Sequence, residues 1–147
     1  MALDYARFLR AQDPVWSSVV AELTLGRKQT HWMWFVFPQL RGLGQSEMAV
    51  FFGLEDADAA ADYMAHPLLA ERMTIACDLV RSHSDKTAAS IFGETDAKKL
   101  QSSMTLFETV PQLSIYAGQV LLDFFNEERC AVTQARLSRP ADLMPGQ

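Results

Sequence analysis

The sequence predicts a mainly α protein, a compact single multi-helical domain with at most a small two-stranded element. Capping residues and helix-ending glycines or prolines recur at short intervals, and apolar residues repeat at i, i+4 and i+7 between them. Apolar residues make up 49% of the 147 positions, enough for a sizeable core. We expect one helical domain over residues 1–138 and a flexible tail over 139–147.

The N-terminal part of the chain predicts two amphipathic helices followed by an ambiguous apolar segment. Residues 3–12 carry apolar side chains along one side of a helix. In the next helix we expect Asp13 as the N-cap, Pro14 as the first helical residue and Gly26 as the end. Residues 31–38, HWMWFVFP, are almost continuously apolar, so periodicity does not decide between a buried strand and a helix.

Seven further short helices are expected after this segment. Ser46 and Asp96 are the expected N-caps of two of them, and His66 is expected to close one helix where Pro67 opens the next. The expected helical ranges are 46–53, 55–66, 67–83, 87–93, 96–110, 114–125 and 131–137.

Composition excludes several classes of protein. A formal net charge of −5 argues against a broad basic surface for DNA or RNA. The N-terminal residues lack the apolar stretch of a secretory signal, and no window is apolar enough to span a membrane. Cys77 and Cys130 are far apart and are expected to be small buried hydrophobes in a reducing cytoplasm. We expect neither a metal nor a cofactor, and a cytoplasmic location.

Residues 26–44, GRKQTHWMWFVFPQLRGLG, contain the first candidate site. No acid occurs between Thr24 and Ser46, whereas Arg27, Lys28 and Arg41 contribute three positive charges. This local excess would suit an anionic ligand, and the aromatic rings could stack on a flat ring. Alternatively, the aromatic residues are core and the basic pair only complements the end of the preceding helix.

The second candidate is the helix over residues 96–107. Lys98, Ser102 and Thr105 fall on one side at helical spacing and could hydrogen-bond a ligand or allow another helix to approach closely. Leu100 and Met104 occupy the opposite side with Phe107 and are expected in the core, so Met104→Ala should be far more costly than Ser102→Ala.

These same segments carry a family resemblance. The blocks GRKQTHWMWFVFPQL and SSMTLF, with weaker similarity from about Phe8 to Phe125, resemble a bacterial family of unknown function whose members sometimes carry the label calpastatin. The resemblance implies a compact, mostly helical domain and no established activity. A calpastatin would be a long disordered chain poor in aromatics, whereas this chain has 10% aromatic residues and a core.

A fainter similarity concerns residues 96–107, DAKKLQSSMTLF. They resemble a helix with the pattern W-x-x-x-K-x-x-x-M in the NADAR (YbiA-like) proteins, which are linked to ADP-ribose and related N-glycosides. This resemblance implies a nucleotide-like ligand.

From these patterns and resemblances we expect a cytosolic domain that binds a phosphate-bearing nucleotide or an ADP-ribose-like molecule. Whether it also hydrolyses an N-glycosidic bond, and so is an enzyme, stays open at this point. The expected catalytic residues are Asp96, His31 and Glu47. The expected ligand-binding residues are Arg27, Lys28, Trp32, Trp34, Gln39, Ser46, Lys98, Ser102 and Thr105. The alternative is a non-catalytic protein-interaction module with the aromatic segment as a partner groove. The sequence predicts no nucleic-acid or membrane partner and leaves the oligomeric state open.

Two burial expectations follow for the aromatic segment. Phe35 and Phe37 should be buried, because so dense an apolar run is unfavourable in water. Lys28 and His31 should edge a polar cavity or face solvent, because burying an isolated charge is costly. The local positive charge favours an anion-holding cavity that they share with Lys98.

Overall fold

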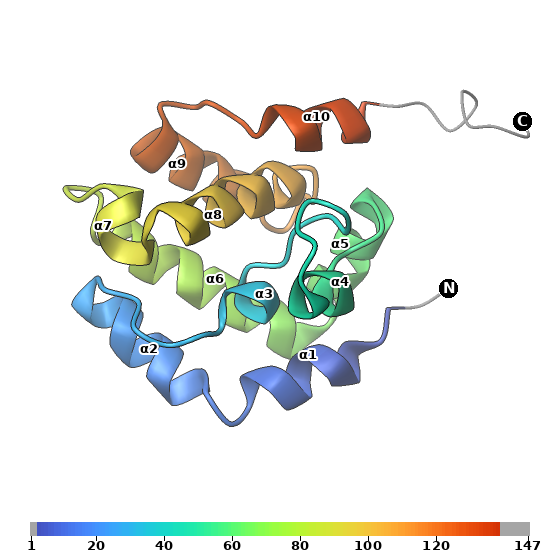
Figure 1. Ribbon diagram of the computed structural model, residues 1–147, viewed down its shortest axis with the longest axis horizontal. Helices are drawn as coiled ribbons and strands as arrows, with labels where there is room; N and C mark the ends of the chain where they lie inside the picture. Colours follow the sequence, from blue (N-terminus) through green and yellow to red (C-terminus); the bar gives the residue numbers. More distant parts are fainter. Residues whose placement is uncertain (1–2, 139–147) are drawn as a thin grey trace, which may run out of the picture.

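The fold is described by a computed structural model, which covers residues 3–138; the tail expected over 139–147 lies outside these residues. Within the described residues the chain forms ten helices that hold well over half of the positions, and it forms no strand longer than a single bridge (Figure 1). The mainly α prediction is therefore confirmed. The helices are α1 (Tyr5–Gln12), α2 (Trp16–Leu25), α3 (Met33–Val36), α4 (Glu47–Phe52), α5 (Ala57–Ala65), α6 (Pro67–Arg81), α7 (Ala88–Phe92), α8 (Glu94–Phe107), α9 (Ser114–Phe125) and α10 (Ala131–Leu137).

The two longest helices, α6 and α8, organise the rest. From bottom to top in Figure 1, α1 and α2 are followed by α6, then by α8 and α9, and finally by α10. Helix α6 contacts α2, α5 and α9, while α8 contacts α5, α7, α9 and α10. Because α8 has neighbours on several sides, it is a central helix, and its side chains are buried around most of its circumference. No helix among residues 3–138 is both long and apolar enough to cross a bilayer.

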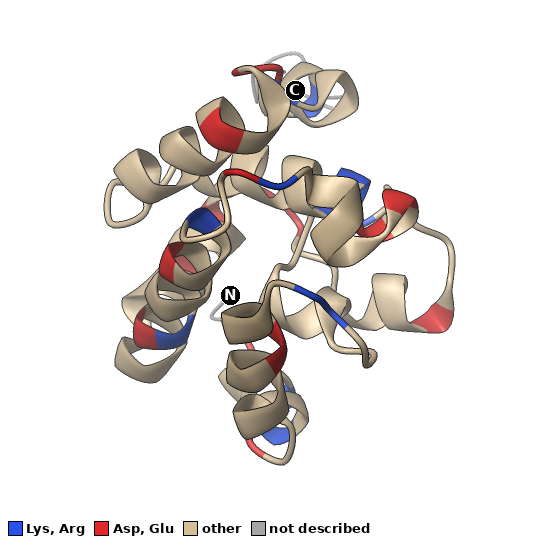
Figure 2. Ribbon diagram, turned by 90° about the vertical axis from the view of Figure 1, so that its left-hand side faces the viewer, with Lys and Arg blue, Asp and Glu red and all other residues tan. Residues whose placement is uncertain are grey.

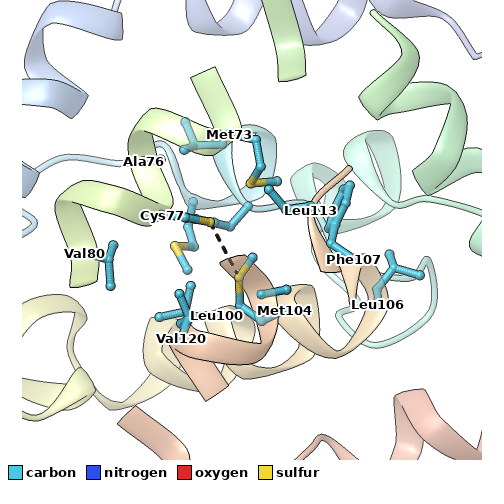
Figure 3. Close-up of a cluster of buried hydrophobic side chains, with 14 of the residues drawn as sticks. Met73, Ala76, Cys77, Val80, Leu100, Met104, Leu106, Phe107, Leu113 and Val120 are labelled. Atoms are coloured by element: carbon cyan, nitrogen blue, oxygen red, sulfur yellow. Dashed lines mark hydrogen bonds between the residues drawn. The ribbon is translucent and has the colours of Figure 1, made fainter. Parts of the chain in front are cut away.

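The centre of the core lies between α6 and α8. Figure 3 shows Met73, Cys77 and Val80 of α6 facing Leu100 and Met104 of α8. All five are at most 1% exposed. The Sγ atom of Cys77 lies 3.8 Å from the Sδ atom of Met104, so the two polarisable sulfurs fill the middle of the contact.

Most helix ends follow from local sequence signals. Gly26 ends α2 in the left-handed conformation at φ 73°, which glycine adopts without strain. The Ser46 side chain accepts from the backbone N–H of Ala49 at 3.1 Å and caps α4. His66 ends α5 and Pro67 begins α6, as expected, and the Nδ1 atom of His66 also caps α6 by accepting from the N–H of Leu68 at 3.2 Å.

Two expected N-caps, Asp13 and Asp96, are wrong, and each carboxylate forms an ion pair with a residue of another part of the chain. Asp13 ends α1 with helical dihedrals, and α2 begins later, after Val15. The Asp13 carboxylate pairs instead with Arg72 at 2.8 Å. Asp96 lies inside the first turn of α8, because Gly93 at φ 83° precedes the helix and starts it one turn earlier than expected.

The ambiguous aromatic segment forms a single helical turn, α3, followed by an extended connection. Leu40 and Leu54 form an isolated parallel bridge, in which Arg41 N–H donates to Leu54 O at 2.8 Å and Leu54 N–H donates to Gln39 O at 2.9 Å. Phe35 and Phe37 are buried as expected. Most of the segment is therefore core, and Trp34 is its half-buried ring.

The expected polar face of α8 is not open to solvent. Ser102 and Thr105 are 8% and 3% exposed, and the adjacent Ser103 is fully buried. The segment that leads into α10 covers them: the Thr105 hydroxyl donates to Gln101 O at 2.7 Å and accepts from Cys130 N–H at 3.0 Å. Of the two alternatives for this face, the close approach of another helix is the one observed, because α10 and the segment before it pack against α8. Lys98 alone of the three expected residues is exposed.

Met104→Ala should destabilise the protein by about 2–5 kcal/mol, because Met104 is fully buried and its removal leaves a cavity at the α6–α8 contact. Chemical denaturation measures the change in the free energy of unfolding. Ile115→Ala on α9 is the control, because Ile115 is 78% exposed and its truncation removes little packing. Equal losses in the two variants would contradict this account of the core.

Candidate functional site

One buried carboxylate organises the loop between α2 and α3. Glu22 is 6% exposed, and its carboxylate accepts four hydrogen bonds. The donors are the backbone N–H groups of Gln29 and Thr30 at 2.6 and 2.9 Å, the Thr30 hydroxyl at 2.6 Å and the Trp32 indole at 3.0 Å. Burial acts to raise the pKa of Glu22, but these donors outweigh it and hold the pKa below its ordinary value. Glu22 therefore remains ionised and holds the loop in one conformation.

The same loop is attached to the C-terminal half of the chain. Lys28 N–H donates to Ile91 O at the end of α7 at 2.7 Å, and the Lys28 ammonium donates to Thr30 O at 2.6 Å. The Lys28 side chain is only 7% exposed, so its charge needs an acid nearby. That acid is Asp96 of α8, whose Oδ2 lies 2.9 Å from the Lys28 ammonium.

Asp96 joins two lysines into a cluster of three charges. Its Oδ1 atom accepts from Lys99 at 3.1 Å while Oδ2 faces Lys28. Each ammonium also lies over an indole ring: Lys28 is 5.1 Å from the centroid of Trp32, and Lys99 is 5.4 Å from that of Trp34. We call these five residues the lysine–tryptophan cluster; its formal charge is +1.

The protonation state of Asp96 limits the chemistry it can perform. Burial acts to raise its pKa, but the hydrogen bonds and charges of Lys28 and Lys99 dominate and lower the pKa below the ordinary value. At neutral pH the group is thus a paired carboxylate without a proton to donate. It is suited to positioning the two ammonium groups rather than to general acid catalysis.

A small pocket opens beside Lys99 and Trp34. It lies between α3, α4 and the N-terminal half of α8, and its volume of about 10 Å³ matches about one water molecule. Its lining residues are Trp34, Phe37, Gln39, Ala49, Phe52, Gly53 and Lys99. The wall is therefore largely apolar, with one amide and one ammonium as its polar groups.

The structure brings together only part of the expected site. Lys28, Trp32 and Asp96 belong to the lysine–tryptophan cluster, and Trp34 and Gln39 line the pocket. Trp32 is fully buried, so its ring is not open to stacking. The remaining expected residues are elsewhere: Arg27, His31, Ser46, Glu47 and Lys98 are exposed, and Ser102 and Thr105 are buried under the segment before α10.

The expectation for the charged groups in the aromatic segment holds for His31, which faces solvent, and is wrong for Lys28. The Lys28 side chain is buried because Asp96 pairs with its ammonium, and Lys98, with which a shared cavity was expected, is exposed. Figure 2 shows acidic and basic positions interspersed along the chain. Cys130 is only partly buried, which corrects the expectation that both cysteines are core residues. Across residues 3–138 no group of three or more His, Cys, Asp or Glu side chains is arranged to hold a metal ion.

Sequence reasoning missed Lys99 and Glu22. Lys99 lies three residues after Asp96 on a helix, a spacing at which opposite charges meet, so this pair was detectable from the sequence. Glu22 lies between the apolar residues Val19 and Leu23 on α2, and an acid on such a buried stripe is a detectable signal for a partnered carboxylate.

Comparisons with known proteins agree with this fold. Residues 2–137 match the family described as "Protein of unknown function (DUF1810)", and the chain belongs to this family. The chain is also similar to the crystal structure of the conserved hypothetical protein Rv1873 from Mycobacterium tuberculosis, with 42% identity over 93% of this chain and 98% of that one and a TM-score of 0.90. No curated protein matches the chain. The expected family of unknown function is confirmed, whereas the similarity to NADAR proteins is not.

Glu22→Gln should lower the free energy of unfolding by about 1–3 kcal/mol at pH 7, because a neutral amide replaces the carboxylate that accepts four donors. The folded-state pKa of Glu22 is lowered, so its contribution is complete above the pKa of the unfolded chain, about 4.3, and is lost as the pH falls through the folded-state pKa. The difference between wild type and variant should therefore shrink on acidification. Urea denaturation at pH 7 and at pH 3 measures it.

The matched control is Glu71→Gln, since Glu71 is exposed on α6. Its effect should stay within about 0.5 kcal/mol. A Glu22→Gln difference that is as large at pH 3 as at pH 7 would contradict the assignment of an ionised, loop-holding carboxylate.

Proposed function

We propose that this member of the DUF1810 family binds a small ligand that carries an anionic group and a flat ring, the nucleotide-like class, at the pocket between Trp34, Gln39 and Lys99. The observation that carries the proposal is the held position of Lys99. Asp96 and the face of Trp34 fix its ammonium at the wall of an apolar pocket. An ammonium has three N–H donors, and Asp96 takes one of them.

The charge at the pocket wall supports an anion rather than a cation. Lys99 is the charged residue among those that line the pocket, no acid is among them, and the partial shielding from water strengthens its attraction for an anionic group. Gln39 adds an amide that can donate to or accept from the same ligand.

The dimensions of the pocket indicate how such a ligand would bind. A volume of about 10 Å³ accommodates one anchoring group, such as a phosphate or carboxylate oxygen. The ring of the ligand would then lie at the mouth, against the half-buried Trp34. This form of binding is anchored at one end and leaves much of the ligand outside the pocket.

Hydrolysis of an N-glycosidic bond has weaker support than binding. Asp96, the acid nearest the pocket lysine, has a lowered pKa and two cationic partners, so it is a poor proton donor at neutral pH. His31 and Glu47, the other two expected catalytic residues, are exposed on the loop before α3 and on the first turn of α4. We therefore assign Asp96 a positioning role toward Lys99.

The protein-interaction module remains a second candidate because of α4. Met48, Val50 and Phe51 on this helix are 38%, 47% and 55% exposed. An interaction surface here would use α4 instead of the buried aromatic segment. A complex that survives Lys99→Gln but is lost in Phe51→Ala would favour this candidate over the ligand pocket.

Lys99→Gln should abolish stabilisation by the ligand, because it removes the cation that anchors the anionic group. Thermal denaturation of the wild type with millimolar ADP-ribose, AMP or inorganic phosphate should reveal a rise in Tm with at least one of them. In the variant the affinity for that compound should fall at least about tenfold, since a charge-assisted hydrogen bond contributes about 1.5–3 kcal/mol.

Lys98→Gln is the matched control, because Lys98 is the exposed neighbour on the same helix and carries the same charge. It should retain the rise in Tm. If none of the three compounds raises Tm in the wild type, or if both variants lose the rise equally, the proposed pocket is wrong.

A further inference from the structure

One side of α4 is an exposed apolar surface. Val50 and Phe51 are about half exposed, and Met48 on the same side of the helix is exposed as well. Ala49 and Phe52, on the opposite side, are buried and line the ligand pocket. Large apolar side chains that gather on one short helix indicate a contact surface. We call Met48, Val50 and Phe51 the α4 patch.

A guanidinium that has no acidic partner among residues 3–138 borders the α4 patch. The Cζ atom of Arg7 on α1 lies 6.0 Å from the centroid of the Phe51 ring and 5.0 Å from that of Phe8. The Nε atom of Arg7 is buried and has no hydrogen-bond partner among the described residues, and Arg7 forms no ion pair with them. A buried donor without an acceptor costs free energy. Because this donor is cationic, a carboxylate is the acceptor that fits it best.

The other charged side chains near Arg7 already have partners. The Arg41 guanidinium donates from Nε to Val50 O on α4 at 3.0 Å, and its Nη1 atom pairs with Glu55. Asp4, the acid nearest to Arg7 in the sequence, caps α1 by accepting from a backbone N–H of that helix. Within the described part of the chain, Arg7 therefore places an uncompensated positive charge beside apolar rings. A complementary segment would carry one acid next to apolar side chains.

Residues 139–147, RPADLMPGQ, contain such a segment. Asp142 is the only acid in this range, and Leu143 and Met144 follow it directly. Proline at position 145 favours an extended conformation of the residue before it, which lowers the conformational entropy that is lost on docking. The sequence of this segment thus matches the α4 patch in charge and in apolar character.

The end of α10 brings this segment close to the patch. Arg136, in the last turn of α10, donates from Nη1 to Arg41 O at 2.6 Å, and Arg41 in turn donates to Val50 O of α4. Figure 1 shows α10 running toward the side of the molecule where α4 and α5 lie. An extended chain advances about 3.3 Å per residue, so residues 139–144 span up to about 20 Å. Helix α4 is only about 9 Å long at 1.5 Å per residue, so the segment is long enough to cross it.

The small size of the α4 patch favours an occupant from the same chain. A stable interface between two proteins buries about 800 Å² of each, from roughly 20–30 residues a side. Three apolar side chains and one guanidinium provide far less. A tethered segment needs less binding free energy, because a short linker gives it an effective concentration in the millimolar range.

We propose that residues 139–147 dock on the α4 patch, with Asp142 paired to Arg7 and with Leu143 and Met144 packed over Phe51. Docking supplies the acceptor for the Arg7 guanidinium and removes apolar surface from water. The ligand pocket stays open, because the opposite side of α4 lines it. A protein partner that binds α4 would have to displace the docked segment, so the segment competes with any such partner.

The test measures backbone order parameters, S², by ¹⁵N relaxation on the full chain. At Leu143 and Met144 S² should exceed about 0.6, the value below which a backbone is flexible. Arg7→Glu and Asp142→Arg should each lower S² below about 0.6, because each brings like charges together. The double variant should restore the wild-type value, since the ion pair forms again with its charges exchanged. Arg10→Glu is the matched control, because Arg10 is exposed on the same helix, and it should leave S² unchanged.

Circular dichroism should confirm that each variant is folded. If Arg7→Glu does not fold, Arg7→Gln takes its place and should also lower S². The proposal is overturned by S² below about 0.6 at both positions in the wild type, by order that persists in Asp142→Arg, or by an equal loss of order in Arg10→Glu. A double variant that does not recover also overturns it. Order that is lost on dilution would identify a second copy of the chain as the source of the contact and would overturn the intramolecular assignment.

Discussion

The buried carboxylate of Glu22 is the interaction on which the candidate site depends. It holds two backbone donors, one hydroxyl and one indole of the α2–α3 loop at a single point. With the Trp32 indole held there, its ring packs against Phe37 and Phe92 in the core. The position of the Lys28 ammonium near Asp96 follows from the same loop conformation. A single acid on α2 thereby sets the geometry of residues far along the chain.

Much of the fold was predictable because its signals are local. Gly26, Ser46 and His66 end or cap helices through contacts with residues at most four positions away, and such contacts depend only on the neighbouring sequence. The failures have a tertiary cause. Asp13 and Asp96 are ordinary capping residues by type, yet each carboxylate is bound to a lysine or arginine that comes from a distant element.

The candidate site was harder to predict for the same reason. Residues 24–46 contain no acid, so the sequence indicates an uncompensated positive charge, whereas the fold supplies Glu22 and Asp96 from α2 and α8. The amphipathic pattern also gave a wrong prediction for α8, because it assigns one solvent-exposed side and one buried side to a helix. This helix has neighbours on several sides, and Ser102, Ser103 and Thr105 are buried with its leucines.

The positions of the tryptophans have a consequence for how unfolding can be observed. All three indoles lie between residues 16 and 34, on α2, the loop and α3, while the backbone signal in circular dichroism averages over helices from α1 to α10. Intrinsic fluorescence is thus a regional probe and dichroism a global one. If the fluorescence and dichroism transitions coincide, the region held by Glu22 unfolds together with the rest of the protein. If the fluorescence changes first, this region is a separate cooperative unit.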